Sequence, residues 1–429
     1  MSTRPDEPSR RARSLHALGV TCGLAAGAWL GAAEAPTKLV TAGFSPFIIS
    51  LGMVAGVFVA RWTVPVIVMG TGRLGHDLRQ RPHLIVWAVV AGMLWVVANT
   101  LTVFAIRDVG LSIAFPLWNT NSLVGLFWAW LLFNELRGAS TRDWGKVAGG
   151  AVAIVAGACV LAYATSHQEV AAPQALSGIL AALGAGLLWG TMYIPYRKAY
   201  ISGMNPLSFV TVFTVGELLT MGVLVLAFGG GVAGVARDLD RARPALFWLF
   251  IGGFCWVIGD LFQQYAAKYI GIGRGIPLSN TNQLWGLAWG VLVFGELRGQ
   301  GATAQALVAI GSLVMIAGAL TISRAEASEG ERRRWEEVTA RECDRYGLDR
   351  REVEAAVGGD QTAPGAGGRR RWWEALIVAG ALGVFALLAS QAGRQELAVS
   401  VSAAVALGAA TAGLLAYAAW MLWKRTRFS

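Results

Sequence analysis

The amino-acid sequence predicts an all-α polytopic membrane protein: a ten-helix bundle of two inverted five-helix repeats, followed by two extra C-terminal transmembrane helices. Composition gives the first reason, because 55% of the 429 residues are hydrophobic and only 14% are charged, against roughly 25% charged residues in a soluble domain. Apolar runs such as 84–106 and 148–164 give the second, since about 20 such residues cross a bilayer as a helix. A repeated segment, described below, gives the third.

The same composition excludes several other classes of protein. The net charge of +10 fits the excess of Lys and Arg in the cytoplasmic loops of membrane proteins, so we expect no nucleic-acid partner. The four cysteines have neither metal-site nor disulfide spacing, and we expect no metal and no cofactor. The first apolar segment has no small-residue cleavage site and contains Glu34, Pro36 and Lys38, which predicts a retained helix instead of a signal peptide.

The apolar segments predict ten spans in the main body and two beyond it, near 15–35, 44–70, 83–106, 109–133, 145–164, 176–196, 206–229, 245–267, 272–295, 303–323, 373–391 and 397–423. The chain then divides into a cytoplasmic tail (1–14), a first five-helix repeat (15–164), a second (165–323), a charged cytoplasmic segment with a linker (324–371) and a C-terminal pair of transmembrane helices (372–429). Mixed charges at helical spacing predict one or two short solvated helices in 329–357, and 362–368 is expected to be a flexible linker.

Basic residues orient the chain in the membrane. Most of them fall in segments that an N-in topology places in the cytoplasm, and those after the last span keep the C-terminus inside. The loop with Arg237, Arg241 and Arg243 is the exception, and Asp238 and Asp240 only partly offset it. We therefore expect a multi-pass protein of the cell (inner) membrane with both termini in the cytoplasm.

An internal repeat is the most informative feature of the sequence. The segment PLWNTNSLVGLFWAWLLFNELRG, from Pro116, aligns without gaps with PLSNTNQLWGLAWGVLVFGELRG, from Pro277, and 15 of the 23 positions are identical. The same offset pairs Asn99 with Asp260. Each repeat has five spans, and this odd number predicts that the second copy enters the membrane from the opposite side. Inverted repeats are typical of transporters, whose solute site lies near the midplane where the halves meet.

A five-plus-five body with a glutamate- and glycine-containing turn after the fourth span of each repeat resembles the drug/metabolite transporter superfamily. The turns are FNELRG (133–138) and FGELRG (294–299), in which Glu135 and Glu296 are interpreted as structural residues, and the resemblance covers 15–323. Within it, WGTMYIPYRKAY (189–200) and the helix IPLSNTNQLWGLAWGVLVFGEL are similar to the glucose/ribose porter family and its rhamnose-transporter relatives. That resemblance implies sugar uptake coupled to protons or another cation. The extension after Arg324 departs from the family pattern.

Polar groups inside the spans mark the candidate solute site, because they are costly in a membrane. Two Asn-Thr-Asn trios each follow a proline that frees a backbone carbonyl, and amides and hydroxyls suit the hydroxyl groups of a sugar. Neighbouring tryptophans are suited to stack on a sugar ring. The alternative is that Asn and Thr hold helices together and Trp marks the membrane interface. The candidate substrate-binding residues are Asn119, Thr120, Asn121, Asn280, Thr281, Asn282, Trp118, Trp285, Gln263 and Gln264.

Acidic residues within spans are the candidates for coupling, namely Glu34, Glu217 and Asp260. A desolvated carboxyl favours its protonated form and can carry a proton. Asp260 is the strongest candidate, since Gln264 lies one helical turn away on the same face. The alternative is an ion pair with Lys268 or Arg61. Of these, Lys268 is expected to be the nearby charge, and Arg61 to extend toward the membrane surface.

Together these features predict a secondary active transporter, and not an enzyme, for a sugar or similar polyhydroxylated solute. No Walker motif is present to bind ATP. An exporter of metabolites, amino acids or drugs is the main alternative. A membrane-embedded enzyme is disfavoured because the histidines lie at segment ends or in a loop, and a receptor or scaffold that uses 324–371 remains open. Membrane lipid is an expected partner, and small residues in the fifth and tenth spans are suited to hold either the bundle or a homodimer together.

Overall fold

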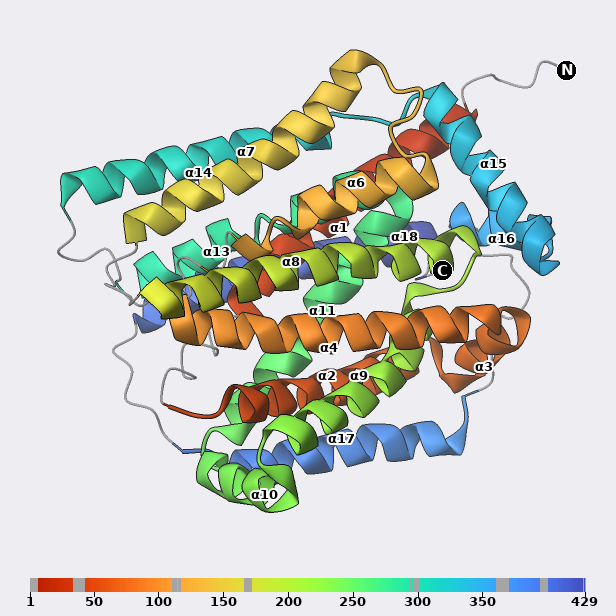
Figure 1. Ribbon diagram of the computed structural model, residues 1–429. Helices are drawn as coiled ribbons and strands as arrows, with labels where there is room; N and C mark the ends of the chain where they lie inside the picture. Colours follow the sequence, from red (N-terminus) through yellow and green to blue (C-terminus); the bar gives the residue numbers. More distant parts are fainter. Residues whose placement is uncertain are drawn as a thin grey trace, which may run out of the picture.

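A computed structural model describes residues 7–33, 43–109, 114, 117–165, 172–293, 295, 301–359, 370–393, 400–426 and 428, and every regular element in this part of the chain is a helix (Figure 1). In chain order these are α1 (Glu7–Ala33), α2 (Pro46–Met69), α3 (Thr71–Gln80), α4 (His83–Val109), α6 (Asn121–Phe133), α7 (Thr141–Thr165), α8 (Ala172–Ile201), α9 (Pro206–Phe228), α10 (Gly231–Ala242), α11 (Leu246–Ile270), α12 (Ile272–Ser279), α13 (Asn282–Ala288), the π-helix η2 (Trp289–Val293), α14 (Ala302–Ser323), α15 (Glu329–Tyr346), α16 (Arg350–Val357), α17 (Trp372–Ser390) and α18 (Val401–Thr426).

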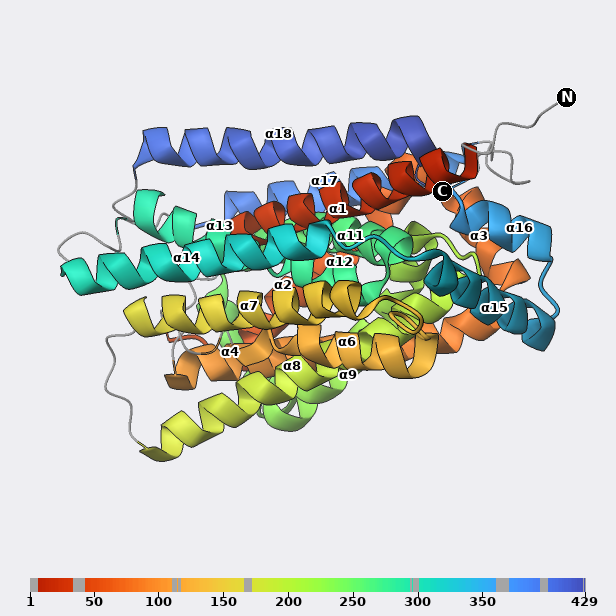
Figure 2. The ribbon, with the colours of Figure 1, turned by 90° about the horizontal axis from the view of Figure 1, so that it is seen from above.

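Ten of the described helices are long and apolar enough to cross a membrane, which confirms the predicted class of an all-helical polytopic protein. They run side by side as a bundle in both views (Figures 1 and 2). The short helices α3, α15 and α16 lie together at one end of this bundle, which we call the capped end (Figure 1). The amphipathic helix α10 lies at the opposite end.

The fourth and ninth predicted spans are not continuous helices, so this part of the prediction is corrected. The helix predicted from residue 272 to 295 consists of α12, a turn at Asn280 and Thr281, α13 and η2. The described part of 109–133 has the matching turn at Asn119 and Thr120, immediately before α6. Broken helices at corresponding positions of two repeats are a recurrent feature of transporter binding sites.

The sequence around each turn explains the break. Pro277 lies inside α12 and has no N–H to donate. The Thr281 hydroxyl then donates to the Leu278 carbonyl at 2.8 Å. In the first repeat the Thr120 hydroxyl makes the same bond to Leu117 at 2.6 Å. Side-chain donors that bond to the preceding turn compete with the regular helix ladder, so the two trios end their first half-helices in the same way.

Glycines bring helices into backbone contact at matching places in the two repeats. A Cβ atom on Gly92 of α4 would lie 2.1 Å from the Phe213 carbonyl oxygen of α9, and one on its repeat mate Gly253 of α11 would lie 2.0 Å from the Met53 carbonyl oxygen of α2. A Cβ on Gly216 of α9 would in turn lie 2.0 Å from the Val89 carbonyl oxygen of α4. No side chain fits at these crossings, so they fix how the helices around the centre pack.

Glycines at matching positions of the two repeats also contact the two broken helices. Gly31 of α1 lies against the Asn282 carbonyl oxygen, and its mate Gly190 of α8 lies against the Asn121 carbonyl oxygen, at Cβ distances of 2.4 and 2.9 Å. These close contacts of α1 and α8 hold the two Asn-Thr-Asn turns in place. Glycines at matching positions of the two predicted repeats thus make equivalent contacts.

The C-terminal extension packs on the outside of the body. The helices predicted in 329–357 are confirmed as α15 and α16, but the expectation that they are only solvated is wrong, because Glu331 and Glu342 are buried against the body. The predicted pair of C-terminal spans corresponds to α17, which packs on α2, and α18, which packs on α1. The predicted linker 362–368 lies outside the described residues.

Candidate functional site

Three charged side chains from three helices meet in the centre of the bundle. The Arg61 guanidinium of α2 donates from Nη1 to Glu217 Oε1 of α9 and from Nη2 to Asp260 Oδ2 of α11, both at 2.8 Å. All three side chains are 0% exposed. The group carries one positive and two negative charges when fully ionised, so it has one uncompensated negative charge. Buried charges of this kind are costly and usually mark a functional site in a membrane protein.

The position of Arg61 corrects two expectations. Arg61 does not extend toward the membrane surface but is a fully buried partner of both acids. It is therefore Arg61, and not Lys268, that the structure pairs with Asp260. The ion-pair alternative considered for Asp260 is confirmed in the Arg61 form.

Aromatic rings surround the guanidinium. The Phe213 ring centroid lies 3.9 Å from Arg61 Cζ, and the rings of Trp95 and Trp256 lie at 5.6 and 5.9 Å. Trp95 and Trp256 are repeat mates, and their ring centroids lie only 5.1 Å apart. Aromatic faces attract a cation where water is excluded. Arg61 therefore lies where corresponding residues of the two repeats meet.

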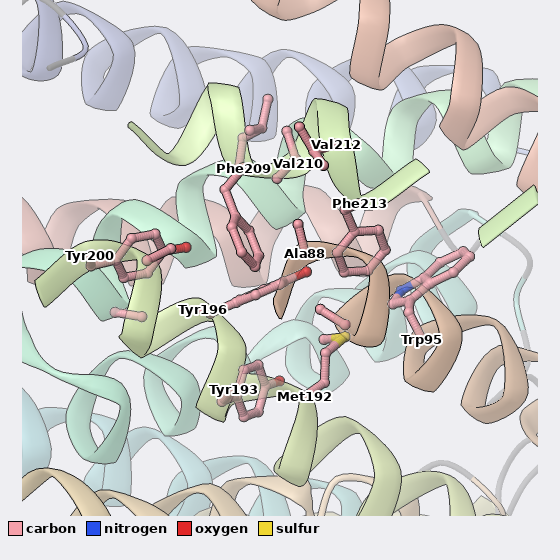
Figure 3. Close-up of a cluster of buried hydrophobic side chains, with 14 of the residues drawn as sticks. Ala88, Trp95, Met192, Tyr193, Tyr196, Tyr200, Phe209, Val210, Val212 and Phe213 are labelled. Carbon is pink, nitrogen blue, oxygen red and sulfur yellow. The ribbon is translucent and has the colours of Figure 1, made fainter. Parts of the chain in front are cut away.

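Tyrosines of α8 line the same region. Tyr193, Tyr196 and Tyr200 follow one another along α8, and Tyr196 packs against Phe209 and Phe213 of α9 (Figure 3). Tyr200 donates its hydroxyl to Gln264 Oε1 at 2.6 Å, and Gln264 Nε2 donates to Asp260 Oδ2 at 2.8 Å. The predicted pairing of Asp260 with Gln264 is thus present, and it extends the charged group to α8.

A second polar cluster joins the two helix breaks. Asn280 Nδ2 donates to Asn121 Oδ1 at 2.9 Å and lies 3.1 Å from the Asn119 carbonyl oxygen. Asn121 Nδ2 lies 3.5 Å from the Tyr193 hydroxyl. Gln263 of α11 donates to the Ser279 hydroxyl at 2.5 Å, at the end of α12. Gln263 and Gln264 are adjacent on α11, so this helix connects the two groups: Gln263 bonds to Ser279 beside the amide cluster, and Gln264 bonds to Asp260 of the charged group.

Several buried polar atoms in and near the two helix breaks have no hydrogen-bond partner within the part of the chain that the structure describes. They are Asn119 Nδ2, Asn282 Oδ1 and Gln283 Nε2, together with the indole N–H groups of Trp189 and Trp289. In and beside the charged group, three further buried atoms have no hydrogen-bond partner among the described residues, namely Glu217 Oε2, Asp260 Oδ1 and the Tyr196 hydroxyl. A buried polar atom without a partner is unstable unless something polar binds to it. These atoms are therefore suited to receive polar groups of a solute and a small cation or proton.

The other predicted site residues have more local positions. The hydroxyls of Thr120 and Thr281 donate to carbonyls of their own half-helices. Trp118 is buried and meets Trp189 edge to face at 6.1 Å. Trp285 of α13 is partly buried, and its Cβ lies 2.7 Å from the position that a Cβ on Gly31 would take.

The remaining acids named from the sequence are Glu34, Glu135 and Glu296. Glu34 is outside the described residues, as is Glu296. Glu135 is buried and accepts hydrogen bonds from the backbone N–H groups of Ile272 and Gly273 at 3.2 and 3.0 Å, and it pairs with Arg197 at 3.0 Å. It therefore ties the turn after α6 to the first turn of α12, a structural role of the kind the sequence indicated.

Sequence reasoning missed the role of Arg61 and of the α8 tyrosines. An arginine between apolar residues, with unpaired acids in other spans, was a signal that a charge partner was needed. The tyrosines were part of the motif quoted for the family resemblance, but nothing in their spacing connected them to Asp260.

The comparisons with known proteins point to transport. Residues 176–324 match the EamA-like transporter family. A protein of Lactobacillus johnsonii named "Putative sugar uptake protein" is 37% identical over 95 residues, which are 21% of this chain and 32% of that protein. Proteins with the same description from Listeria monocytogenes and Listeria innocua are 30% and 21% identical, over 35% and 56% of this chain and 48% and 78% of their own.

The first two of these relatives are thus matched over less than half of their length. A solved crystal structure superposes on 72% of this chain and 96% of its own with 19% identity and a TM-score of 0.45. The family match covers the region from early α8 to the end of α14, which holds Glu217, Asp260 and the second helix break. Over this region, about a third of the chain, the sequence is similar to the EamA-like transporter family.

Proposed function

We propose that this protein is a secondary active carrier that takes up a sugar or similar polyhydroxylated solute by alternating access, coupled to a proton or another cation. In this proposal the two repeats are inverted in the cell membrane, both termini are cytoplasmic, and the protein acts by transport without catalysis or a cofactor. The family match and the description of the three relatives support the class of protein and of solute.

The observation that carries the proposal is the amide cluster between the two helix breaks. Asn121 and Asn280 come from different repeats, bind each other and are buried. Asn119 Nδ2 and Asn282 Oδ1 have no hydrogen-bond partner among the described residues. Each hydroxyl group of a polyhydroxylated solute can both donate and accept hydrogen bonds, which matches amides that can do both. Helix breaks at the meeting point of two repeats are where transporters bind their solutes.

The charged group supports coupling. Glu217 and Asp260 share one guanidinium, so a single proton or monovalent cation makes the group neutral. Gln264 and Gln263 connect this group with the amide cluster along α11. We propose that loading of the acids and loading of the amides are linked through this helix, so that the bundle changes conformation only when both are filled or both are empty.

Counterflow in proteoliposomes tests the proposal. The purified protein is loaded with an unlabelled candidate, and entry of the labelled form is followed for a panel of sugars, amino acids and amphipathic drugs. Trans-stimulation by one or more sugars is expected. Trans-stimulation only by amino acids or drugs would favour the exporter alternative and would contradict the choice of solute.

The amide cluster makes a specific prediction for the same assay. Asn121→Ala or Asn280→Ala should weaken solute affinity about fivefold, because each removes a hydrogen bond worth about 1 kcal/mol. Gln174→Ala removes an exposed amide on α8 and serves as the matched control, with unchanged affinity. If the Asn variants lose folded protein but keep their affinity, these residues act as packing contacts and do not bind solute.

A further inference from the structure

The extension after α14 is bound across the capped end of the bundle. We call residues 328–358 the strap; it contains α15 and α16 (Figure 1). Ser328 caps α15 by accepting from the Glu331 N–H, and its hydroxyl lies 3.2 Å from the Gly138 carbonyl oxygen. From there the strap crosses to α8 and then to the α3–α4 corner. It therefore touches elements of both predicted repeats.

Glu331 makes the tightest of these contacts. Its two carboxylate oxygens accept from the Arg274 guanidinium of α12 at 2.7 and 2.8 Å, and Oε1 also accepts from the Leu136 N–H at 3.1 Å. The side chains of Glu331 and Arg274 are 0% and 1% exposed. Arg274 is on α12 in the second repeat, whereas Leu136 follows α6 in the first. One carboxylate of the strap thus bonds to both repeats beside the broken helices.

Two further glutamates continue the contact. Glu342 accepts from Lys198 Nζ of α8 at 2.7 Å, and Glu352 accepts from Arg81 Nη2 between α3 and α4 at 3.1 Å. Between them the Tyr346 ring stacks on His83 at 3.7 Å. Each basic partner belongs to the body and each acid to the strap. The strap therefore binds the body through a row of charge pairs, of which the first is fully buried.

In alternating access, helices at the capped end must separate whenever the solute site opens toward that end. The strap bonds to several of these elements, namely α8, α12, the corner between α3 and α4, and the corner between α6 and α7. We propose that the strap is an inhibitory clamp, which holds the capped end closed and must release Arg274, Lys198 and Arg81 before that end can open. This inference rests on the proposed alternating access. By the predicted topology the clamp acts on the cytoplasmic side.

Cys343 provides a native reporter for release of the strap. It lies on α15, and its side chain is 2% exposed. Burial also raises the pKa of its thiol, which reduces the reactive thiolate. A maleimide therefore labels Cys343 slowly while the strap is bound. A background with Cys22→Ala, Cys159→Ala and Cys255→Ala leaves it as the single thiol.

Charge-neutral variants test the clamp in the full-length protein. The clamp variant combines Glu331→Gln, Glu342→Gln and Glu352→Gln. The matched control combines Glu336→Gln, Glu337→Gln and Glu354→Gln, which make the same change on exposed faces of the same helices. A charge exchange provides a second test if the clamp variant folds poorly. The double variant Glu331→Arg/Arg274→Glu restores the buried pair and should behave like the wild type. Either single substitution alone should release the strap.

Two measurements read the result. Labelling of Cys343 should be about tenfold faster in the clamp variant, as expected when a local opening becomes easier, and unchanged in the control. Spin labels on Gln80→Cys and Arg324→Cys, in a background without the native cysteines, should give an additional population of longer distances in the clamp variant alone. Faster labelling without a change in these distances would overturn the clamp, and so would labelling that is equally slow in both variants.

The distance measurement needs no solute, so it separates this proposal from the proposed function. Added distances together with no transport of any sugar would leave the clamp standing and contradict the choice of solute. Sugar counterflow that is equally fast in wild type and clamp variant, with unaltered distances, would confirm the carrier and overturn the clamp. With both proposals correct, counterflow in the clamp variant should be several-fold faster than in the wild type.

Discussion

Helices α4 and α11 occupy equivalent places in the two repeats, yet only one of them carries the polar chemistry. Both contribute a tryptophan to the central contact and a glycine to a backbone crossing. At the positions where α11 has Asp260, Gln263 and Gln264, α4 has Asn99, Thr102 and Val103. Asn99 lies 3.4 Å from the Ser50 hydroxyl and Thr102 bonds to its own helix.

The difference separates two kinds of constraint. Residues that pack the helices have been kept in both copies, because both halves need the same crossings. Residues that pair with Arg61 occur once, because a second buried acid pair would require a second buried cation. The bundle therefore has two similar sets of helix crossings around a single buried charged group.

The largest expected effect comes from removing Arg61, the cation that pairs with Asp260 of α11 and Glu217 of α9. Arg61→Met leaves Glu217 and Asp260 buried beside each other without a countercharge. Breaking a buried ion pair from one side costs roughly 3–5 kcal/mol, so little folded protein should survive purification. Size-exclusion yield and thermal unfolding in detergent measure this. The triple variant Arg61→Met/Glu217→Gln/Asp260→Asn removes all the charges and should recover most of the stability, whereas failure to recover would mean that packing of the guanidinium dominates.

Glycine variants test the close helix crossings that the two predicted repeats have in common. The repeat mates Gly92 of α4 and Gly253 of α11 are equally crowded. Substitution by alanine would place a Cβ 2.1 Å from a backbone oxygen at Gly92 and 2.0 Å from one at Gly253. Both substitutions should lower stability by roughly 1–3 kcal/mol, and by similar amounts, because overpacking forces a backbone shift. Gly222→Ala, where a Cβ would meet no atom within 4 Å, is the control and should be neutral or slightly stabilising. Unequal costs for the two mates would argue against equivalent halves.

The smallest effect on stability and the most specific effect on function are expected for Asp260→Asn. This variant gives α11 the side chain that α4 has, and Glu217 still balances Arg61. It should exchange solute across the membrane, since exchange requires no net movement of protons, but it should not accumulate solute against a gradient. Uptake with and without an uncoupler measures the difference. Accumulation that remains intact and sensitive to the uncoupler would exclude Asp260 and leave Glu217 or Glu34 as the coupling acid.

Long apolar runs and the 23-residue repeat are sufficient to predict the helical class, most helix positions and some of the polar residues that gather at the centre, such as Asp260 and Gln264. They did not predict the helix breaks at Asn119 and Asn280, since apolar residues continue on both sides of each turn. Arg61 was assigned to the membrane surface because its distance from the helix end permits that conformation, and only the tertiary fold brings Glu217 and Asp260 to it. The strap was unpredictable for the same reason, since mixed charges indicate a solvated helix until basic partners such as Arg274 are found buried beneath it.

The seam between α7 and α14 has a consequence for how such a chain could arise. Gly150 lies against the Gly318 carbonyl oxygen and Gly157 against the Gly311 carbonyl oxygen, with Cβ distances of 2.8 and 2.6 Å. Gly311 and Gly318 are the repeat mates of Gly150 and Gly157, so exchanging the halves reproduces the same two contacts. That reciprocity is the mark of an isologous interface between identical subunits. Each five-helix half therefore contributes the same pair of glycines to the seam, so two copies of one such half would offer each other the same two contacts.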